Sequence, residues 1–274
     1  MTAKSPETGP LETFVRLRRG FIPRTVSIAL TARLDGADPE AASHAFEVFT
    51  RGVDAWLCRG EKVRLISATV HADAAAGLFV ETWEAAFPRM SPNAFAMFAR
   101  MAAASVPGAK RMEIREHGDE RALCVRGFES EGEATILDVP WRIAFVPAME
   151  SAVRVVFTEP IAPATAEEIA EVLTAWAAVL TLGGFSGAHG EPASTGTVIT
   201  SVDATAEREL VLRFERIACG YDAWEALFEA LLPVNEQVAI ARVEIRGGDT
   251  SFPMTADWSR LIGAPGERGG SAVV

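Results

Sequence analysis

Residues 26–49 read VSIALTARLDGADPEAASHAFEVF, and they align without a gap with residues 153–176, VRVVFTEPIAPATAEEIAEVLTAW. Four positions are identical, pairing Val26 with Val153, Thr31 with Thr158, Ala37 with Ala164 and Glu40 with Glu167. In the first copy an apolar residue occupies every second position from Val26 to Leu34, which is typical of a strand, and apolar residues then recur at helical spacing. A strand followed by a helix therefore occurs twice in this chain.

Two further echoes follow in the same order along the chain. WEAAF at residues 83–87 is matched by WEALF at residues 224–228, and RMEIR at residues 111–115 is matched by RVEIR at residues 242–246. We expect the tryptophan segments to lie in equivalent helices and the arginine segments in equivalent strands. Three echoes in one order indicate a tandem duplication, which constrains the architecture far more than the chemistry.

The order of the predicted elements indicates the fold class. In the second half we expect strands at residues 152–158, 197–203, 209–217 and 238–246, with helices at 166–182 and 222–232. This β-α-β-β-α-β order is that of the ferredoxin-like fold. The first half shows the same order with one middle strand unidentified. The prediction is an α+β protein, a tandem duplication of a ferredoxin-like (βαββαβ) unit with an inserted β-hairpin between the copies.

The sequence divides into five predicted parts. In residues 1–20 the apolar residues follow neither a helical nor a strand period, so we expect a flexible N-terminal arm there. The two ferredoxin-like units are expected at residues 21–117 and 151–250. Residues 118–150 have no counterpart in the repeat, and two strand-like segments around an acidic turn predict a connecting β-hairpin there. Residues 251–274 are rich in glycine, proline and serine and predict a C-terminal tail.

The composition is that of a globular protein, with 49% hydrophobic and 23% charged residues. No apolar run reaches the roughly 18 residues that a membrane-spanning helix needs. The first residues also lack the apolar core of a secretory signal, so we expect a cytoplasmic location and no contact with a membrane. The three cysteines are far apart and form no C-x-x-C pair, which argues against a disulfide framework or a zinc site.

The net charge of −11 argues against nucleic acid as a partner, because a phosphate backbone would be repelled. The same charge favours a protein partner with a basic surface, since complementary charge speeds encounter and sets specificity. Glu129, Glu131 and Glu133, in the acidic turn of the predicted hairpin, are the candidate residues for this contact. A homo-oligomer stays open as an alternative.

The repeated R-x-E-x-R motif supplies the other candidate binding residues. On a strand, all three charged residues of each copy share one face, opposite the apolar residues between them. Because the last strand of a ferredoxin-like sheet lies at an edge, such a row of charges would discourage edge-to-edge aggregation. In the alternative interpretation the arginines bind an anion and the glutamate orients them. The candidates are Arg111, Glu113, Arg115, Arg242, Glu244 and Arg246.

Other motifs do not assemble into a site. The glycines from Gly183 onward follow a predicted helix rather than a strand, so helix termination explains them better than a phosphate loop. Ser186 lacks the final glycine of a G-x-S-x-G nucleophile elbow. His71 and Asp73 could share one face of a strand, but no further metal ligand accompanies them in the sequence. We therefore expect no catalytic residue, no metal site and no cofactor.

These observations favour a non-catalytic cytosolic interaction protein, of the adaptor or immunity/inhibitor type, that uses an acidic surface to bind a macromolecular partner. The alternative is an enzyme or a small-anion-binding protein with a pocket between the two repeats, since duplicated folds often leave a cleft. Catalysis stays open, because catalytic groups can converge in space from distant parts of a sequence.

Overall fold

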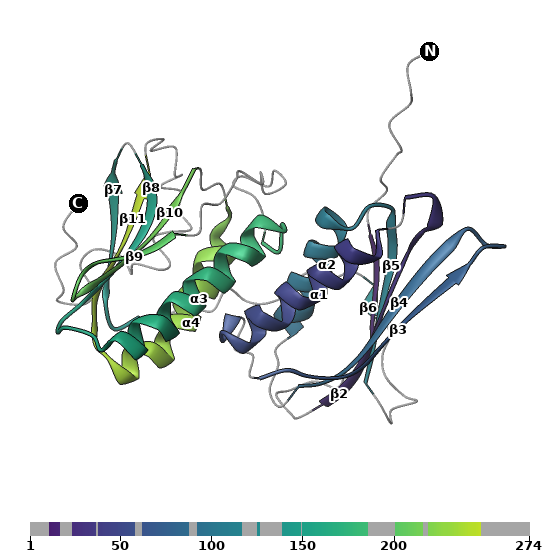
Figure 1. The fold of residues 1–274 in the computed structure, drawn as a ribbon, viewed down its shortest axis with the longest axis horizontal. Helices are drawn as coiled ribbons and strands as arrows, with labels where there is room; N and C mark the ends of the chain where they lie inside the picture. The colour runs from purple at the N-terminus through teal and green to yellow at the C-terminus, as the bar shows by residue number, and fades with distance from the viewer. Residues whose placement is uncertain are drawn as a thin grey trace, which may run out of the picture. The chain divides into compact units, whose positions relative to one another are not determined.

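The computed structural model is a mixed α+β protein with two β-sheets and four α-helices among the residues that it describes (Figure 1). These residues are 11–16, 24–36, 38–57, 62–87, 92–116, 125–126, 139–148, 150–185, 201–215 and 219–247. The chain divides into two compact units. Unit 1 contains Met1–Asp54 and Cys58–Glu131, and unit 2 contains Ala55–Leu57 and Gly132–Val274.

Unit 1 has a sheet in the order β3-β4-β2-β5-β1-β6. Its neighbouring strands are antiparallel except β1 and β5, which run parallel. Helices α1 and α2 pack against each other on one face of this sheet (Figure 1). The elements are β1 (Glu12–Arg16), β2 (Arg24–Arg33), the 3-10 turn η1 (Leu34–Gly36), α1 (Pro39–Asp54), β3 (Arg64–Asp73), β4 (Leu78–Phe87), α2 (Pro92–Ser105), β5 (Ala109–Glu116) and β6 (Val125–Arg126).

Unit 2 has a sheet in the order β7-β11-β8-β10-β9, in which only β7 and β11 run parallel. Helices α3 and α4 pack against each other beside this sheet (Figure 1). If the strands of each unit are numbered from 1 along the chain and the sheet of unit 2 is read from β9 to β7, both sheets have the order 3-4-2-5-1. Unit 1 has one further strand, β6, beside its first strand. The elements are β7 (Arg142–Pro147), β8 (Ser151–Phe157), α3 (Pro163–Thr181), β9 (Ser201–Ala206), β10 (Glu209–Phe214), α4 (Tyr221–Gln237) and β11 (Ile240–Gly247).

The helix ends follow from local sequence. At the start of α1, the Asp38 carboxylate accepts a hydrogen bond from the backbone N–H of Ala41, while Pro39 occupies the first position, where no backbone N–H is needed. At the end of α3, Gly183 adopts a φ of 74°, a conformation that residues with a Cβ rarely take. Gly183 and Gly184 therefore terminate α3, and their backbone N–H groups donate to the carbonyl oxygens of Leu180 and Val179.

The core of unit 1 is a cluster of aromatic rings between the sheet and its helices. Phe46 of α1 stacks on Trp83 of β4 with ring centroids 4.7 Å apart, and Phe49 stacks on Phe98 of α2 at the same distance. Phe98 also meets the edge of Trp83. Each of these four side chains is at most 4% exposed. Aromatic burial of this kind supplies both apolar area and specific geometry.

The core of unit 2 centres on Trp176 of α3. Its ring meets Phe214 of β10 edge-on at 5.8 Å and lies 5.2 Å from Trp224 of α4. Its indole N–H donates a 2.7 Å hydrogen bond to the backbone oxygen of Ala223. Trp176 thus ties both helices to the sheet.

The tryptophan echo in the sequence does not reflect equivalent positions. Trp83 lies in strand β4, whereas Trp224 lies in helix α4. The predicted helix around Trp83 and Phe87 is therefore wrong. In β4, buried and half-buried residues alternate along the whole strand, which is the period of a strand with one face on the core. β4 is also the middle strand that the sequence interpretation left unidentified.

The other two echoes fall on matching elements but not in matching register. Ile114 of β5 lies opposite Ile28 of β2, whereas Ile245 of β11 lies opposite Val153 of β8. In the gap-free alignment, Val153 corresponds to Val26. The isoleucine of the motif therefore pairs with position 28 in unit 1 and with the equivalent of position 26 in unit 2, a difference of two residues. A shift of two residues keeps the same side chains on the core face, because side chains alternate with a period of two.

Two predicted connecting regions differ from the structure. Part of the predicted N-terminal arm, Glu12–Arg16, forms strand β1, which pairs with β5 in the sheet of unit 1. The predicted β-hairpin within residues 118–150 is wrong, because its two strands enter different sheets: β6 pairs with β1, and β7 pairs with β11. The pairing partners lie far away in sequence, so local patterns did not show them. The predicted tail at residues 251–274 lies outside the described residues.

Among the described residues, no helix has both the length and the apolar character needed to cross a membrane.

Candidate functional site

The R-x-E-x-R motifs do not lie on edge strands. β5 has β2 on one side and β1 on the other, and β11 lies between β8 and β7. The predicted edge position is therefore wrong in both units, because each sheet gains a parallel strand, β1 or β7, outside the last strand of the predicted unit. Protection of an exposed edge does not explain these charges.

In unit 1 the motif forms a local ion-pair cluster. Glu113 pairs with both Arg111 and Arg115 of the same strand. Both arginine side chains are about half exposed, at 47% and 57%. Ion pairs at such a surface contribute little to stability, since water and salt screen them.

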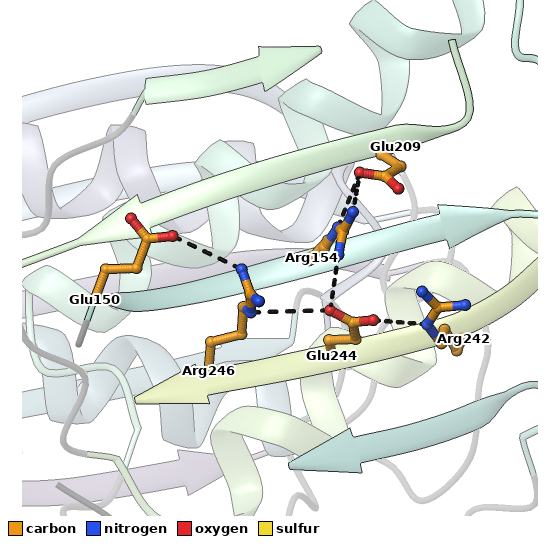
Figure 2. A network of polar contacts seen from close by, with 6 residues as sticks. All are labelled: Glu150, Arg154, Glu209, Arg242, Glu244 and Arg246. Atoms are coloured by element: carbon orange, nitrogen blue, oxygen red, sulfur yellow. Dashed lines mark hydrogen bonds and ion pairs between the residues drawn. The ribbon is translucent and has the colours of Figure 1, made fainter. Parts of the chain in front are cut away.

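In unit 2 the motif belongs to a larger network that spans neighbouring strands (Figure 2). Arg154 of β8 donates to Glu209 of β10 and, at 3.2 Å, to Glu244 of β11. Glu244 also accepts a 2.6 Å hydrogen bond from Arg242, and Arg246 lies within ion-pair distance of Glu244 and of Glu150. The structure thus brings Arg242, Glu244 and Arg246 together with three charged residues that the sequence did not single out: Glu150, Arg154 and Glu209.

The charges of this network compensate one another. Burial alone would raise the pKa of Glu244, but the hydrogen bonds and charges of Arg242 and Arg154 outweigh burial and lower it. The Glu244 side chain is only 9% exposed, so its arginine partners replace the water that it loses. An arginine that is already paired with a carboxylate is a poor receptor for a further anion. The network therefore favours a structural role for these residues.

We expect Glu244→Gln to lower the free energy of unfolding of unit 2 by about 1–3 kcal/mol, because it removes the charge that three arginines surround. The matched control is Glu113→Gln, at the same motif position in unit 1, where the exposed pairs predict a loss below about 1 kcal/mol. Chemical denaturation followed by circular dichroism measures both. Equal losses in the two variants would contradict the distinction between a surface cluster and a partly buried network.

The remaining sequence candidates do not form a site among the described residues. Glu129, Glu131 and Glu133 lie outside these residues. Asp73 accepts hydrogen bonds from the backbone N–H groups of Ala75 and Ala76, so it stabilises the turn between β3 and β4. Burial raises the pKa of the Cys219 thiol, which keeps it protonated and weakly nucleophilic. No group of three or more potential metal ligands occurs in the described part of the chain.

An open groove in unit 1 is the best candidate site. It lies between α1, the start of β3 and β4, and it has a volume of about 270 Å³. Its apolar lining comes from the sheet and from one face of α1, and acidic and hydroxyl side chains complete it. The lining residues are Ser43, Phe46, Glu47, Thr50, Asp54, Val63, Leu65, Ala68, Glu81 and Trp83.

Glu81 of β4 is the chemically distinctive residue of the groove. It is only 2% exposed, although it lines the groove. Its Oε1 accepts a 2.8 Å hydrogen bond from the Ser43 hydroxyl of α1, whereas its buried Oε2 makes no hydrogen bond of normal geometry with any described residue. A buried carboxylate oxygen without a partner is costly, so its presence calls for an explanation.

Burial raises the pKa of two carboxyl groups in the groove. Burial raises the pKa of Glu81 above its ordinary value of 4.5, and the Ser43 hydroxyl and the Trp83 indole offset only part of the rise. Burial also raises the pKa of Asp54, against the opposing effects of the Val63 backbone N–H and the Lys62 charge. Both carboxylates would gain from a cation that replaces their lost water.

The position of Glu81 results from the alternation along β4. Phe79, Glu81 and Trp83 share the face that points toward the helices, and the neighbours of Glu81 on that face are core residues. A charged residue in a buried position of an alternating strand is the sequence signal for this site. The helix assigned to this segment concealed the signal, because helical spacing does not place residues 79, 81 and 83 on one face.

The pH dependence of stability is expected to identify Glu81. Because its pKa is raised in the folded state, ionised Glu81 costs stability above pH 4.5, and that cost disappears as the pH falls toward 4.5. Glu244, whose pKa is lowered, behaves oppositely and loses its stabilising effect as the pH falls below 4.5. Denaturation of the wild type and Glu81→Gln between about pH 4 and pH 7 measures this. The variant is expected to gain most near neutral pH, and a constant difference would contradict the assignment.

The chemistry of the groove fits a cation with an apolar stem. Three carboxylates, those of Glu47, Asp54 and Glu81, line it, while Phe46, Trp83 and the aliphatic residues provide apolar contact. An ammonium or guanidinium group can donate to the exposed carboxylates of Glu47 and Asp54 and lie close to the buried charge of Glu81. Its aliphatic stem can cover apolar surface at the same time.

No family model matches the sequence, and no curated protein matches it. Among solved structures, the chain is similar to an unknown protein from Galdieria sulphuraria. The two share 13% sequence identity over 78% of this chain and 93% of that chain, with a TM-score of 0.25.

Proposed function

We propose that this chain is a non-catalytic interaction protein, of the adaptor or inhibitor type, that acts in the cytoplasm and binds a basic protein partner through the groove of unit 1. The observation that carries the proposal is the Glu81 carboxylate, which is buried at the groove and whose charge the Ser43 hydroxyl and the Trp83 indole compensate only in part. A site that keeps such a group at a cost in stability is typical of function rather than of packing.

The acidic charge of the whole protein supports a basic partner. A net charge of −11 attracts cationic surfaces over distances longer than a contact, which raises the rate of encounter. The groove then supplies the specific contact, because its carboxylates lie beside apolar walls and discriminate against anionic groups. Glu129, Glu131 and Glu133, the contact residues predicted from the sequence, lie outside the described residues, and we propose Glu47, Asp54 and Glu81 in their place.

The alternative of an anion-binding protein receives less support. It relied on Arg111, Arg115, Arg242 and Arg246, and each of these arginines pairs with a glutamate of its own motif. An anion would have to displace Glu113 or Glu244, which are held in the same strands. The groove, in contrast, is lined by three carboxylates, which repel an anion.

We also propose that the two units descend from a tandem duplication of a ferredoxin-like unit, with a strand added at the start of each copy. The shared strand order and the matching placement of the R-x-E-x-R strands support this. On this proposal, the copies diverged after the duplication. Divergence then explains the two-residue difference in register and the different elements that hold Trp83 and Trp224.

A peptide-display selection against the full chain tests the proposed function. From a random library, the wild-type protein is expected to enrich peptides with lysine or arginine, and Glu81→Gln is expected to lose most of that enrichment. Glu84→Gln is the matched control, because Glu84 lies three residues along the same strand and faces the other side of the sheet. The groove would be rejected as the binding site if Glu81→Gln enriched the same peptides as the wild type, or if both variants lost enrichment equally.

A further inference from the structure

The free edge of the sheet in unit 1 lies next to the groove. In the part of the chain that the structure describes, β3 pairs with β4 alone and ends the sheet. β3 has 10 residues, whereas the edge strands β6, β7 and β9 have 2, 6 and 6. It contains no proline, and its charged residues, Arg64 and Asp73, stand at its two ends. A register shift between Leu65 and Ser67 interrupts the pairing of β3 with β4, but the pairing is regular from Ser67 to Asp73, so this stretch of the edge can accept a further strand.

The side chains of β3 add an apolar surface to this edge. Leu65, Ile66 and Val70 are 50%, 48% and 58% exposed. Val70 lies directly opposite Glu81, and Ala68 lies opposite Trp83, so both point to the face that carries the helices. That face of β3 is therefore left open beside the groove, and a further strand would cover it.

From these observations, and resting on the proposed function, we infer that the partner contributes an extended segment that adds to β3 as a new edge strand and places a lysine in the groove. Strand addition supplies main-chain hydrogen bonds, and side-chain pockets supply the specificity. Because side chains alternate along a strand, every second residue of the segment points to the face that holds Glu81.

The distances favour a long basic side chain. The added strand lies two strand spacings from β4, or about 10 Å, so only a long side chain spans the gap to Glu81. A lysine stem would lie over Leu65 and Ala68 and carry its ammonium to the carboxylates, in the way that such stems cover apolar surface elsewhere. The alternate residues of the added segment point to the other face of the sheet, where small or polar side chains are sufficient.

A second copy of this chain fits the edge less well. Leu65, Ala68, Val70 and Ala72 share the face of β3 that Glu81 occupies on β4, so a pairing β3 from another copy would bring no positive charge to Glu81. Arg64 pairs with Ala86, on the opposite face from Glu81. The charge of the groove therefore selects a different, basic chain.

The test is isothermal titration of the full chain with a capped seven-residue peptide that alternates lysine and threonine. Two further peptides carry N-methyl groups on the lysines only or on the threonines only. Because backbone N–H groups of alternate residues point to opposite edges of an extended strand, one methylated peptide is expected to bind at least about tenfold more weakly while the other keeps its affinity. Hydrogen exchange is expected to slow at β3 when the unmethylated peptide binds.

The outcomes separate this inference from the proposed function. If both methylated peptides bind as tightly as the parent, or if the parent peptide fails to bind at millimolar concentration, strand addition to β3 is rejected. If a peptide with glutamine in place of lysine binds equally well, the proposed function itself fails. Sedimentation of the protein as a dimer with its β3 amides already protected would assign the edge to a second copy and also reject the inference.

Discussion

Trp176→Ala is expected to destabilise unit 2 by about 3–5 kcal/mol, which is the usual cost of removing a large buried aromatic side chain. Trp176 is fully buried, and its ring contacts Phe214 of the sheet and Trp224 of the neighbouring helix. Alanine would leave a cavity at the point where α3, α4 and β10 meet. Chemical denaturation followed by circular dichroism measures the loss as a shift of the unit 2 transition.

Trp176→Phe serves as the matched control for that cavity. Phenylalanine keeps most of the ring but cannot donate the hydrogen bond to the Ala223 oxygen, so a smaller loss of about 1–2 kcal/mol is expected. A loss below about 1 kcal/mol in the alanine variant would show that Trp176 does not hold the layers of unit 2 together.

Glu81→Gln is expected to weaken binding of a basic peptide by about 10- to 100-fold, because it removes the charge that the bound ammonium pairs with. The substitution keeps the side-chain volume and the oxygen that accepts from Ser43. Calorimetric titration of the two proteins with the lysine–threonine peptide measures the change. Glu84→Gln, on the other face of β4, is expected to change the affinity by less than about threefold.

The same substitution separates a binding site from a structural carboxylate. If Glu81 is kept for a ligand, its loss is expected to raise the stability of the free protein by roughly 1 kcal/mol, because a buried charge that is only partly compensated disappears. If Glu81 instead holds α1 to the sheet through Ser43, Glu81→Gln destabilises the protein and leaves peptide affinity unchanged. The two quantities, stability and affinity, are thus expected to move in opposite directions.

The sequence predicted the elements whose signals are local. The strand and helix of residues 26–49 are recognisable because the alternating and helical spacings of apolar residues act within a few residues. β4 alternates regularly, but its WEAAF segment resembles the WEALF segment of α4, and that resemblance predicts a helix where a strand forms. At Trp83 the resemblance between the two halves predicts a helix and the local alternation predicts a strand. The residues form a strand, as the local alternation predicts.

The candidate site depended on contacts that no local pattern contains. Arg154 and Glu209 are 55 residues apart in sequence and meet because β8 pairs with β10. Ser43 and Glu81 are 38 residues apart and meet because α1 packs over β4. The groove itself exists because α1 leaves the outer strand β3 uncovered, and such an arrangement is set by packing of the whole unit.

The most direct test of the account is the pKa of Glu81, measured from the carbon-13 shift of its side-chain carboxyl group with and without the lysine–threonine peptide. We expect a pKa above 4.5 in the free protein and a lower pKa when the peptide is bound, because the ammonium stabilises the ionised carboxylate. A pKa of Glu81 that stays the same at saturating peptide would contradict the claim that this groove binds a cation.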